Sequence, residues 1–136
     1  MLVSTRGRYA LNVMMDLAEN SNDDFIPLKD IAMRQNISQK YVSSIMSVLS
    51  KAGFVEAVHG KGGGYKLVKK PEEYTVASIL RLTENSLATV SCLEKGSPEC
   101  AKAGVCRTLP VWVKLQKVMD DYLESVTLSD LINNNI

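Results

Sequence analysis

The chain lacks any apolar run that approaches the roughly 18 residues of a membrane span, although 46% of its 136 residues are hydrophobic. Its first residues, MLVSTRGRYAL, also lack an apolar segment followed by a small-residue cleavage site, which a secretory signal would contain. Charged residues make up 23% of the chain, an ordinary share for a globular protein. We therefore expect a cytoplasmic protein of one domain, with no membrane partner.

Cysteine and histidine are scarce in this chain. The three cysteines, Cys92, Cys100 and Cys106, all lie within residues 92–106, and His59 is the single histidine. The chain has no C-x-x-C pair, which a small thiol redox enzyme or metal-transfer protein would use. The segment GKGGG lacks the G-x-x-x-x-G-K-[ST] spacing of a nucleotide-binding loop. These absences argue against an enzyme.

The cysteine spacing, C-x7-C-x5-C, is typical of neither a disulfide pair nor a closed four-cysteine metal site. Clustered thiols in a cytoplasmic chain are metal-binding or redox-active more often than structural. Thiolates are soft ligands that suit iron–sulfur clusters, zinc or copper(I), and a loop with Gly96, Pro98 and Gly104 can fold around such a group. The spacing alone leaves a metal centre and a thiol redox switch open.

Acidic residues are absent from residues 38–53, and the charge of the whole chain is unevenly distributed. Residues 1–70 carry ten Lys and Arg against six Asp and Glu, whereas residues 71–136 carry six basic and nine acidic residues. Within residues 38–70 the one acidic residue is Glu56, against six lysines. This asymmetry fits a surface that binds a polyanion.

Helical periodicity predicts three helices in the N-terminal half, over residues 4–20, 28–35 and 38–53. Ser4 or Thr5 can cap the first helix, and Ser38 and Gly53 suit the start and the end of the third. The opposite face of the third helix carries only lysines and serines, which suits a close approach to phosphate. The expected core-facing residues are Ala10, Val13, Met14 and Leu17, then Leu28, Ile31 and Ala32, then Val42, Ile45, Met46 and Leu49.

Two strand-like segments, FVEAV and YKLVK, flank the glycine-rich HGKGGG and predict a hairpin. Two helices followed by a basic hairpin is the order of a winged helix-turn-helix, in which the second helix enters the major groove of double-stranded DNA. We therefore expect a roughly palindromic operator as the ligand. We assign base contacts to Ser38, Gln39, Lys40, Tyr41, Ser43 and Ser44, wing contacts to His59, Gly60, Lys61 and Gly62, and phosphate contacts to Arg6 and Arg8.

The C-terminal half predicts a short helix capped by Thr75 and a longer helix over residues 108–126. Apolar residues in the longer helix alternate at intervals of three and four, which predicts a heptad seam on a helix about 28 Å long. Because this helix lies outside a compact head, we expect it to form a homodimer. LSDLI is expected to form a final helix packed on the head or on the partner. The seam residues are Trp112, Leu115, Met119, Tyr122 and Val126.

The expected fold is mainly α with a small β-hairpin wing, a winged helix-turn-helix followed by a long C-terminal dimerisation helix. We assign residues 1–70 to DNA binding, residues 71–107 to a connecting helix and a cysteine-containing sensor loop, and residues 108–136 to the dimerisation and C-terminal helices. Together these regions would form one compact, domain-swapped-like dimer.

Several segments together resemble the Rrf-type winged-helix transcription regulators of bacteria, over nearly the whole chain. They are GRYAL, PLKDIAMRQNISQKYVSSIMSVLSKAGFV, HGKGGGYKL, the three cysteines and VTLSDLI. In the cluster-binding members, three cysteines in this loop ligate an iron–sulfur cluster that reports iron, oxygen or nitric oxide and alters DNA binding. The resemblance implies a regulator, which we interpret as a repressor, with Cys92, Cys100 and Cys106 as ligands of a [2Fe-2S] or [4Fe-4S] cluster.

The match departs from two familiar ligand patterns of the family. IscR-like members have five residues between the first two cysteines and a His three residues after the last, whereas this chain has seven residues and Leu109. NsrR-like members take an acidic ligand from the first helix of the partner chain, where this chain has Arg8. The fourth ligand is therefore unassigned, with a carboxylate, the partner chain and an exchangeable small ligand as the options. A CymR-like repressor controlled by a protein partner, with no cluster, is the alternative.

Overall fold

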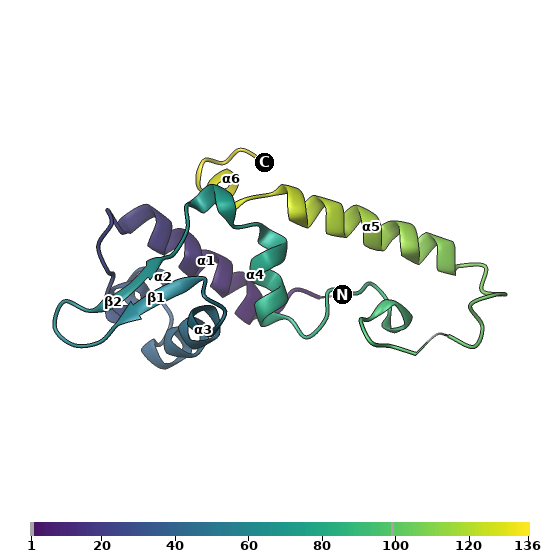
Figure 1. Ribbon diagram of the computed structural model, residues 1–136, viewed down its shortest axis with the longest axis horizontal. Helices are drawn as coiled ribbons and strands as arrows, with labels where there is room; N and C mark the ends of the chain where they lie inside the picture. The colour runs from purple at the N-terminus through teal and green to yellow at the C-terminus, as the bar shows by residue number, and fades with distance from the viewer. Residues whose placement is uncertain (1, 99) are drawn as a thin grey trace.

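The computed structural model describes residues 2–98 and 100–136, and it has a helical head from which one C-terminal helix extends (Figure 1). This is the mainly α fold with a small β-hairpin that the sequence predicts. Within the described ranges, no helix is both long enough and apolar enough to cross a membrane. In chain order the elements are α1 (Thr5–Asn20), α2 (Leu28–Gln35), α3 (Gln39–Lys51), β1 (Val55–Val58), β2 (Gly64–Leu67), η1 (Pro71–Glu73), α4 (Val76–Thr83), η2 (Ser91–Leu93), α5 (Leu109–Ser125) and α6 (Leu128–Ile132).

Side-chain caps determine where several helices start. Ser4 Oγ accepts a hydrogen bond from the Gly7 N–H at 2.9 Å, and Ser38 Oγ accepts one from the Tyr41 N–H at 3.1 Å. Thr75 forms a capping box at the start of α4. These hydroxyls satisfy backbone donors that have no partner within their own helices. The predicted starts of α1, α3 and α4 are therefore confirmed.

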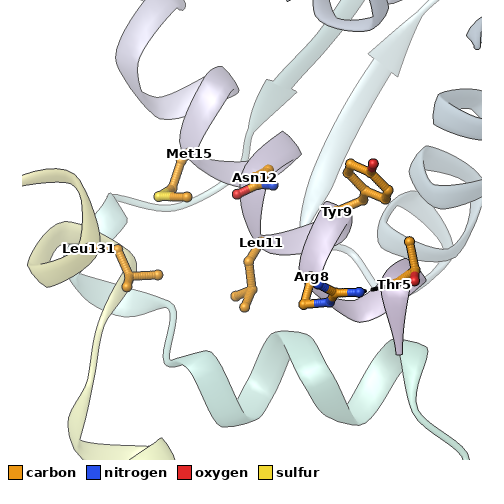
Figure 2. Close-up of a pocket in the computed structure, with 7 residues that line it drawn as sticks. All are labelled: Thr5, Arg8, Tyr9, Leu11, Asn12, Met15 and Leu131. Atoms are coloured by element: carbon orange, nitrogen blue, oxygen red, sulfur yellow. Dashed lines mark hydrogen bonds between the residues drawn. The ribbon is translucent and has the colours of Figure 1, made fainter. Parts of the chain in front are cut away.

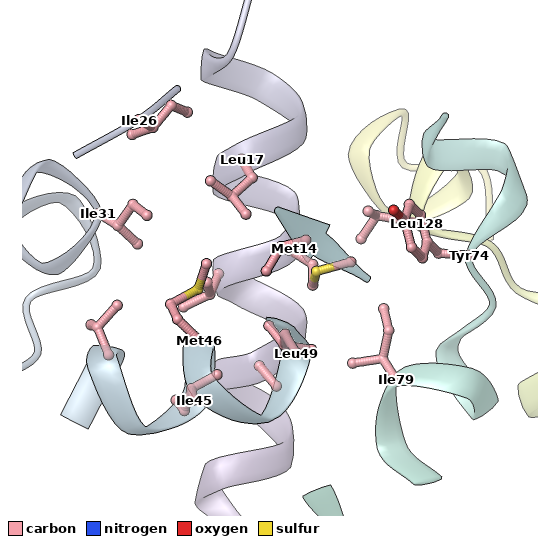
Figure 3. Packing of buried hydrophobic residues seen from close by; sticks show 14 of the residues in the cluster. Met14, Leu17, Ile26, Ile31, Ile45, Met46, Leu49, Tyr74, Ile79 and Leu128 are labelled. Atoms are coloured by element: carbon pink, nitrogen blue, oxygen red, sulfur yellow. The ribbon is translucent and has the colours of Figure 1, made fainter. Parts of the chain in front are cut away.

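Helix α1 runs through the centre of the head and contacts α2, α3, α4, α6 and β2. Its Met14 and Leu17 are fully buried and meet Ile31 of α2 and Met46 of α3 in one cluster (Figure 3). The predicted core-facing residues of the three N-terminal helices are all buried except Leu28, which is half-buried. Each fully buried aliphatic side chain contributes about 1.5–3 kcal/mol, so burial against α1 holds the head together.

Strands β1 and β2 pair antiparallel and form the predicted wing. Tyr74, which follows η1, fixes the base of this hairpin. Its O–H donates to the Phe54 carbonyl at 2.7 Å and accepts from the N–H groups of Val68 at 3.2 Å and Lys69 at 2.9 Å. Burial raises the pKa of the Tyr74 phenol, so it remains a donor at neutral pH. The wing is thereby tied to the core.

A second, smaller apolar cluster joins α5 to the head. Val126, directly after α5, is buried against Val76 and Leu80 of α4, and its carbonyl accepts a hydrogen bond from the Val76 N–H at 2.9 Å. The Leu128 N–H donates to the Tyr74 carbonyl at 2.8 Å, and α6 packs on α1. The final helix therefore packs on the head of its own chain, one of the two outcomes expected from the sequence.

The apolar seam predicted on α5 is wrong at its C-terminal end, whereas its Leu115 and Tyr122 are exposed. Val126 is buried in its own chain, and Trp112 and Met119 are half-buried. The row of α5 that includes Gln116 and Leu123 faces the same chain. Periodicity alone does not tell which of two adjacent apolar rows a helix turns inward, which is why the prediction fails. The exposed row, called the α5 stripe, consists of Val111, Leu115, Val118 and Tyr122, with exposed fractions of 56%, 42%, 65% and 54%.

Asp16 of α1 is a buried carboxylate, with an exposed fraction of 4%. Arg34 of α2 donates to both of its oxygens, from Nε to Oδ2 at 3.0 Å and from Nη2 to Oδ1 at 2.6 Å. Gln35 Nε2 donates to Oδ2 at 3.0 Å. A buried carboxylate is strongly unfavourable without such partners. These bonds therefore fix α2 against α1 and orient the helix-turn-helix.

Replacing Arg34 with Ala should lower the free energy of unfolding by about 2–3 kcal/mol, because the Asp16 carboxylate stays buried and loses its ionic partner. Lys29→Ala, at an exposed position of the same helix, is the control and should change this free energy by less than about 0.5 kcal/mol. Urea unfolding followed by circular dichroism measures both variants. Equal effects of the two substitutions would contradict the role of the ion pair.

Candidate DNA-binding surface and cysteine loop

Helix α3 presents the polar face that the sequence predicts. Its inward residues Ile45 and Leu49 are fully buried. Helix α2 precedes it across a turn in which Asn36 adopts a left-handed conformation, with φ 54°. The arrangement leaves the opposite side of α3 open to a ligand. Of the residues assigned to base contacts, Ser38, Gln39, Lys40 and Ser43 are exposed, and Tyr41 and Ser44 are half-buried.

Tyr41 and Ser44 are held by the first half of α1. The Tyr41 ring packs edge-on against Tyr9, with ring centroids 5.8 Å apart and an interplanar angle of 88°. Such a pair contributes about 0.5–1.5 kcal/mol beyond its burial. Arg6 Nη2 donates to the Ser44 carbonyl at 3.3 Å, so this arginine, predicted as a phosphate contact, has a partner within the protein. Helix α1 therefore sets the position of α3.

Arg8, the second predicted phosphate contact, is exposed on α1. Its Nη2 donates to Thr5 Oγ1 at 3.1 Å. It lines a groove of about 510 Å³ whose apolar lining comes from Leu11 and Met15 of α1 and Leu131 of α6 (Figure 2). Residues two apart on a helix do not share a face. The structure therefore does not bring the two predicted arginines together.

The wing tip is exposed and depends on glycine. All four residues assigned to wing contacts, His59, Gly60, Lys61 and Gly62, are exposed. Gly60 and Gly62 have φ values of 90° and 77°, which lie in the left-handed region that favours glycine. Strand β1 contacts α3, and Figure 1 shows both at the end of the head away from the far end of α5. The strand that leads into the wing tip therefore packs beside α3 at this end of the head.

The three cysteines lie on the connection between α4 and α5 (Figure 1), called the cysteine loop, residues 84–108. Cys92 lies in η2, and it and Cys100 are exposed, while Cys106 is half-buried. All three are free thiols. Across residues 2–98 and 100–136, no group of three His, Cys, Asp or Glu residues comes together as a metal site. A single chain in this conformation therefore does not preassemble the predicted ligand set.

Cys106 lies just before α5, with its Sγ 3.5 Å from Thr108 Oγ1. The hydrogen bond with this hydroxyl, together with the backbone N–H groups of Thr108 and Leu109, lowers the pKa of the Cys106 thiol. Unpaired N–H groups at the start of a helix favour an anionic sulfur. The thiolate is the form that binds soft metals and iron–sulfur clusters. The donor set of the loop therefore fits such a group in its chemistry.

Gln116 of α5 fixes the segment that precedes the cysteines. Its Oε1 accepts from the Thr89 N–H at 2.6 Å, and its Nε2 donates to the Leu87 carbonyl at 3.0 Å and to Asp120 Oδ1 at 2.9 Å. The sequence prediction missed this residue. The sequence offered one signal for it, because Gln116 is a polar residue one turn after Trp112 on a helix face with apolar neighbours.

Comparisons with known proteins extend over nearly the whole chain. The sequence model of the Rrf2 family, described as an iron-dependent transcriptional regulator, matches residues 3–134. Protein rrf2 of Nitratidesulfovibrio vulgaris is 36% identical over 134 residues, which cover 98% of this chain and 89% of that protein. The structure of IscR from T. potens has a TM-score of 0.77 and 34% identity, covering 100% of this chain and 89% of the other. CymR, the global cysteine regulator of B. subtilis, has a TM-score of 0.79 and 31% identity, covering 98% of each chain.

These similarities include the head, the cysteine loop and α5, so they go beyond the helix-turn-helix that many unrelated regulators share. The matched family consists of transcriptional regulators and not of enzymes. The partner implied by such a protein is DNA. The chain therefore belongs to the Rrf2 family of DNA-binding transcriptional regulators.

Proposed function

We propose that this regulator represses transcription as a homodimer and senses iron–sulfur or redox status through a cluster bound by Cys92, Cys100 and Cys106. The observation that carries the proposal is the position of the three free thiols, on one loop between the DNA-binding head and the α5 stripe. The proposed regions are residues 1–70 for DNA binding, 71–107 for sensing and 108–136 for dimerisation.

The proposed DNA contact combines α3 in the major groove with the wing at the adjacent backbone or minor groove. Lys40 and the serines of α3 offer hydrogen-bond donors to base edges and phosphates. The absence of acidic residues from 38–53 removes repulsion from the phosphates. The wing adds the charge of Lys61 and a hydrogen bond from His59. The proposed contacts are Ser38, Gln39, Lys40, Tyr41, Ser43 and Ser44 of α3, His59, Gly60, Lys61 and Gly62 of the wing, and Arg6 and Arg8.

The α5 stripe supports the proposed homodimer. A row of large apolar side chains on one exposed helix face is typical of a protein interface. Its intervals of four, three and four residues are those of a helix–helix seam. A two-fold dimer needs a self-complementary surface, and two copies of an apolar stripe meet this condition. Such a dimer would present two copies of α3 to two operator half-sites.

The chemistry of the cysteine loop supports cluster binding. Three soft donors lie within one segment. The lowered pKa of the Cys106 thiol favours the thiolate, which is the form that binds a metal. When bound, an iron–sulfur cluster supplies a redox-active centre. Because no three potential ligands come together among the residues that the structure describes, ligation requires the loop to change shape. With Leu109 and Arg8 at the familiar ligand positions, we propose a carboxylate, the partner chain or a small ligand as the fourth donor.

A CymR-like regulator without a cluster is the second candidate. The CymR structure is similar over 98% of both chains, and no three potential ligands lie together among the residues that the structure describes. In this case the cysteines bind nothing and a protein partner controls the repressor. Absorption spectra of protein purified without oxygen distinguish the two candidates, because only the first has an iron–sulfur chromophore.

Lys40→Glu should weaken operator binding by at least about tenfold, because it removes a phosphate or base contact and adds repulsion. The operator is the duplex that the wild type selects from a random pool, and fluorescence anisotropy measures the affinity. Wild-type affinity should fall steeply with salt concentration. Lys95→Glu changes the net charge equally, but in the cysteine loop, and should stay within about twofold. Full binding by the Lys40→Glu protein would exclude α3 as the DNA-reading helix.

Val118→Lys should convert the dimer into monomers, because two copies of this helix would bury like charges in the α5 stripe. Val113→Lys is the matched control, since Val113 is also exposed but lies on the side of α5 opposite the stripe. Sedimentation velocity at micromolar concentration measures both variants. A monomeric wild type, or monomers from both variants, would show that the stripe is not the dimer seam.

Replacing Cys92, Cys100 or Cys106 individually with Ala should abolish the visible absorbance of anaerobically purified protein, because each thiolate is a cluster ligand. Far-UV circular dichroism and the dimer should remain unchanged, because the cysteine loop contributes little to the core. Ser97→Ala, at an exposed position of the same loop, is the control and should retain the spectrum. Stoichiometric zinc without iron, in protein expressed with ample iron and sulfide, would refute the cluster and leave DNA binding intact.

A further inference from the structure

Glu84 joins the cysteine loop to the first turn of α1. It comes directly after α4 and begins the loop. Its Oε1 accepts two hydrogen bonds from Ser4, one from the backbone N–H at 3.0 Å and one from the hydroxyl at 2.7 Å. Ser4 Oγ in turn accepts a hydrogen bond from the Gly7 N–H at 2.9 Å. One carboxylate therefore completes the network that caps α1.

The glycine at position 7 makes this contact possible. A Cβ at Gly7 would overlap Glu84 Oε1 and would lie 3.2 Å from both Leu80 Cδ2 and Thr83 Oγ1. Gly7 is buried where α1 and α4 pack together. The glycine lets the end of α4 approach the start of α1, where unpaired N–H groups favour a carboxylate.

The same segment of α1 also holds α3. Arg6, two residues after Ser4, donates to the Ser44 carbonyl at 3.3 Å. One turn further, Tyr9 packs edge-on against Tyr41. The first turns of α1 therefore contact Glu84 on one side and the DNA-facing helix on the other.

We propose that Glu84 is a positioning residue for DNA recognition and couples the cysteine loop to α3 through the first turns of α1. The inference rests on the proposed function of α3 and of the loop. The carboxylate contacts neither DNA nor a cluster. It fixes the position of Ser4, and the first turn of α1 then places Arg6 against Ser44 of α3. Displacement of the loop breaks the bonds to Ser4 and shifts α3. Because coupling between two sites is reciprocal, operator binding must also stabilise the start of the loop.

The first experiment measures affinity for two probes, the operator selected by the wild type and a scrambled duplex of the same composition. Glu84→Ala should lower operator affinity by about tenfold or more, the effect of losing hydrogen bonds to a charged group. Its affinity for the scrambled duplex should stay within about twofold, because phosphate contacts do not depend on the register of α3. A merely structural role would lower both affinities together and leave their ratio unchanged, which would overturn the inference.

Two variants serve as controls for the ratio of operator affinity to scrambled-duplex affinity. Glu84→Gln keeps an oxygen that can accept both hydrogen bonds, and Glu72→Ala removes an exposed carboxylate elsewhere in the chain. Both should keep the ratio within about threefold of the wild type. If Glu84→Ala does not fold by far-UV circular dichroism, Glu84→Asp takes its place. Its side chain is shorter by one methylene group and should cause the same loss of specificity.

Hydrogen exchange tests the coupling without any cofactor. Operator binding to the wild type should slow amide exchange in residues 84–91, and this protection should disappear in Glu84→Ala. The scrambled duplex should give no such protection in either protein. Unchanged exchange in residues 84–91 of the operator-bound wild type overturns the coupling while operator recognition stands. Failure of the wild type to select any sequence overturns both the inference and the proposed DNA contacts.

Discussion

Burial of α1 is the interaction on which the rest of this structure depends. The helix contacts α2, α3, α4, α6 and β2, and its residues Met14 and Leu17 are completely removed from solvent. Truncating one such side chain to alanine typically costs about 2–5 kcal/mol, a large part of the roughly 5–15 kcal/mol that stabilises a domain. Helix α3 and α4, the helix before the cysteine loop, are therefore held by the same central element.

Polar contacts along α1 add direction to this packing. Hydrophobic burial is non-directional, so it brings helices together without fixing one orientation. The ion pair of Asp16 with Arg34 orients α2, the hydrogen bond from Arg6 orients α3, and the bonds from Ser4 to Glu84 fix the end of α4. These contacts therefore fix the orientations of α2, α3 and the end of α4 relative to α1.

The cysteine loop differs from the head in its physical character. Cys92 and Cys100 are exposed, and apart from η2 the described part of the loop has no regular secondary structure. Segments with few buried contacts open and rearrange at low free-energy cost. The loop is nevertheless fixed at three points, by Glu84 at its start, by Gln116 at Leu87 and Thr89, and by α5 at its end. A change in the loop can therefore be transmitted to the head and to the α5 stripe.

The sequence by itself determined the α-helices, the caps of α1, α3 and α4, the buried faces of the three N-terminal helices and the wing, because periodicity and capping depend on residues within a few positions of one another. It also indicated the polar face of α3 and the cysteine cluster by composition. Only the tertiary structure decided which residues form the α5 stripe. Two adjacent rows on this helix have the same periodicity, and only packing against the rest of the chain shows which one is buried. The same holds for the bonds between Glu84 and Ser4, which lie 80 positions apart. No local pattern specifies such a pair; the packing of α4 on α1 at Gly7 brings it together.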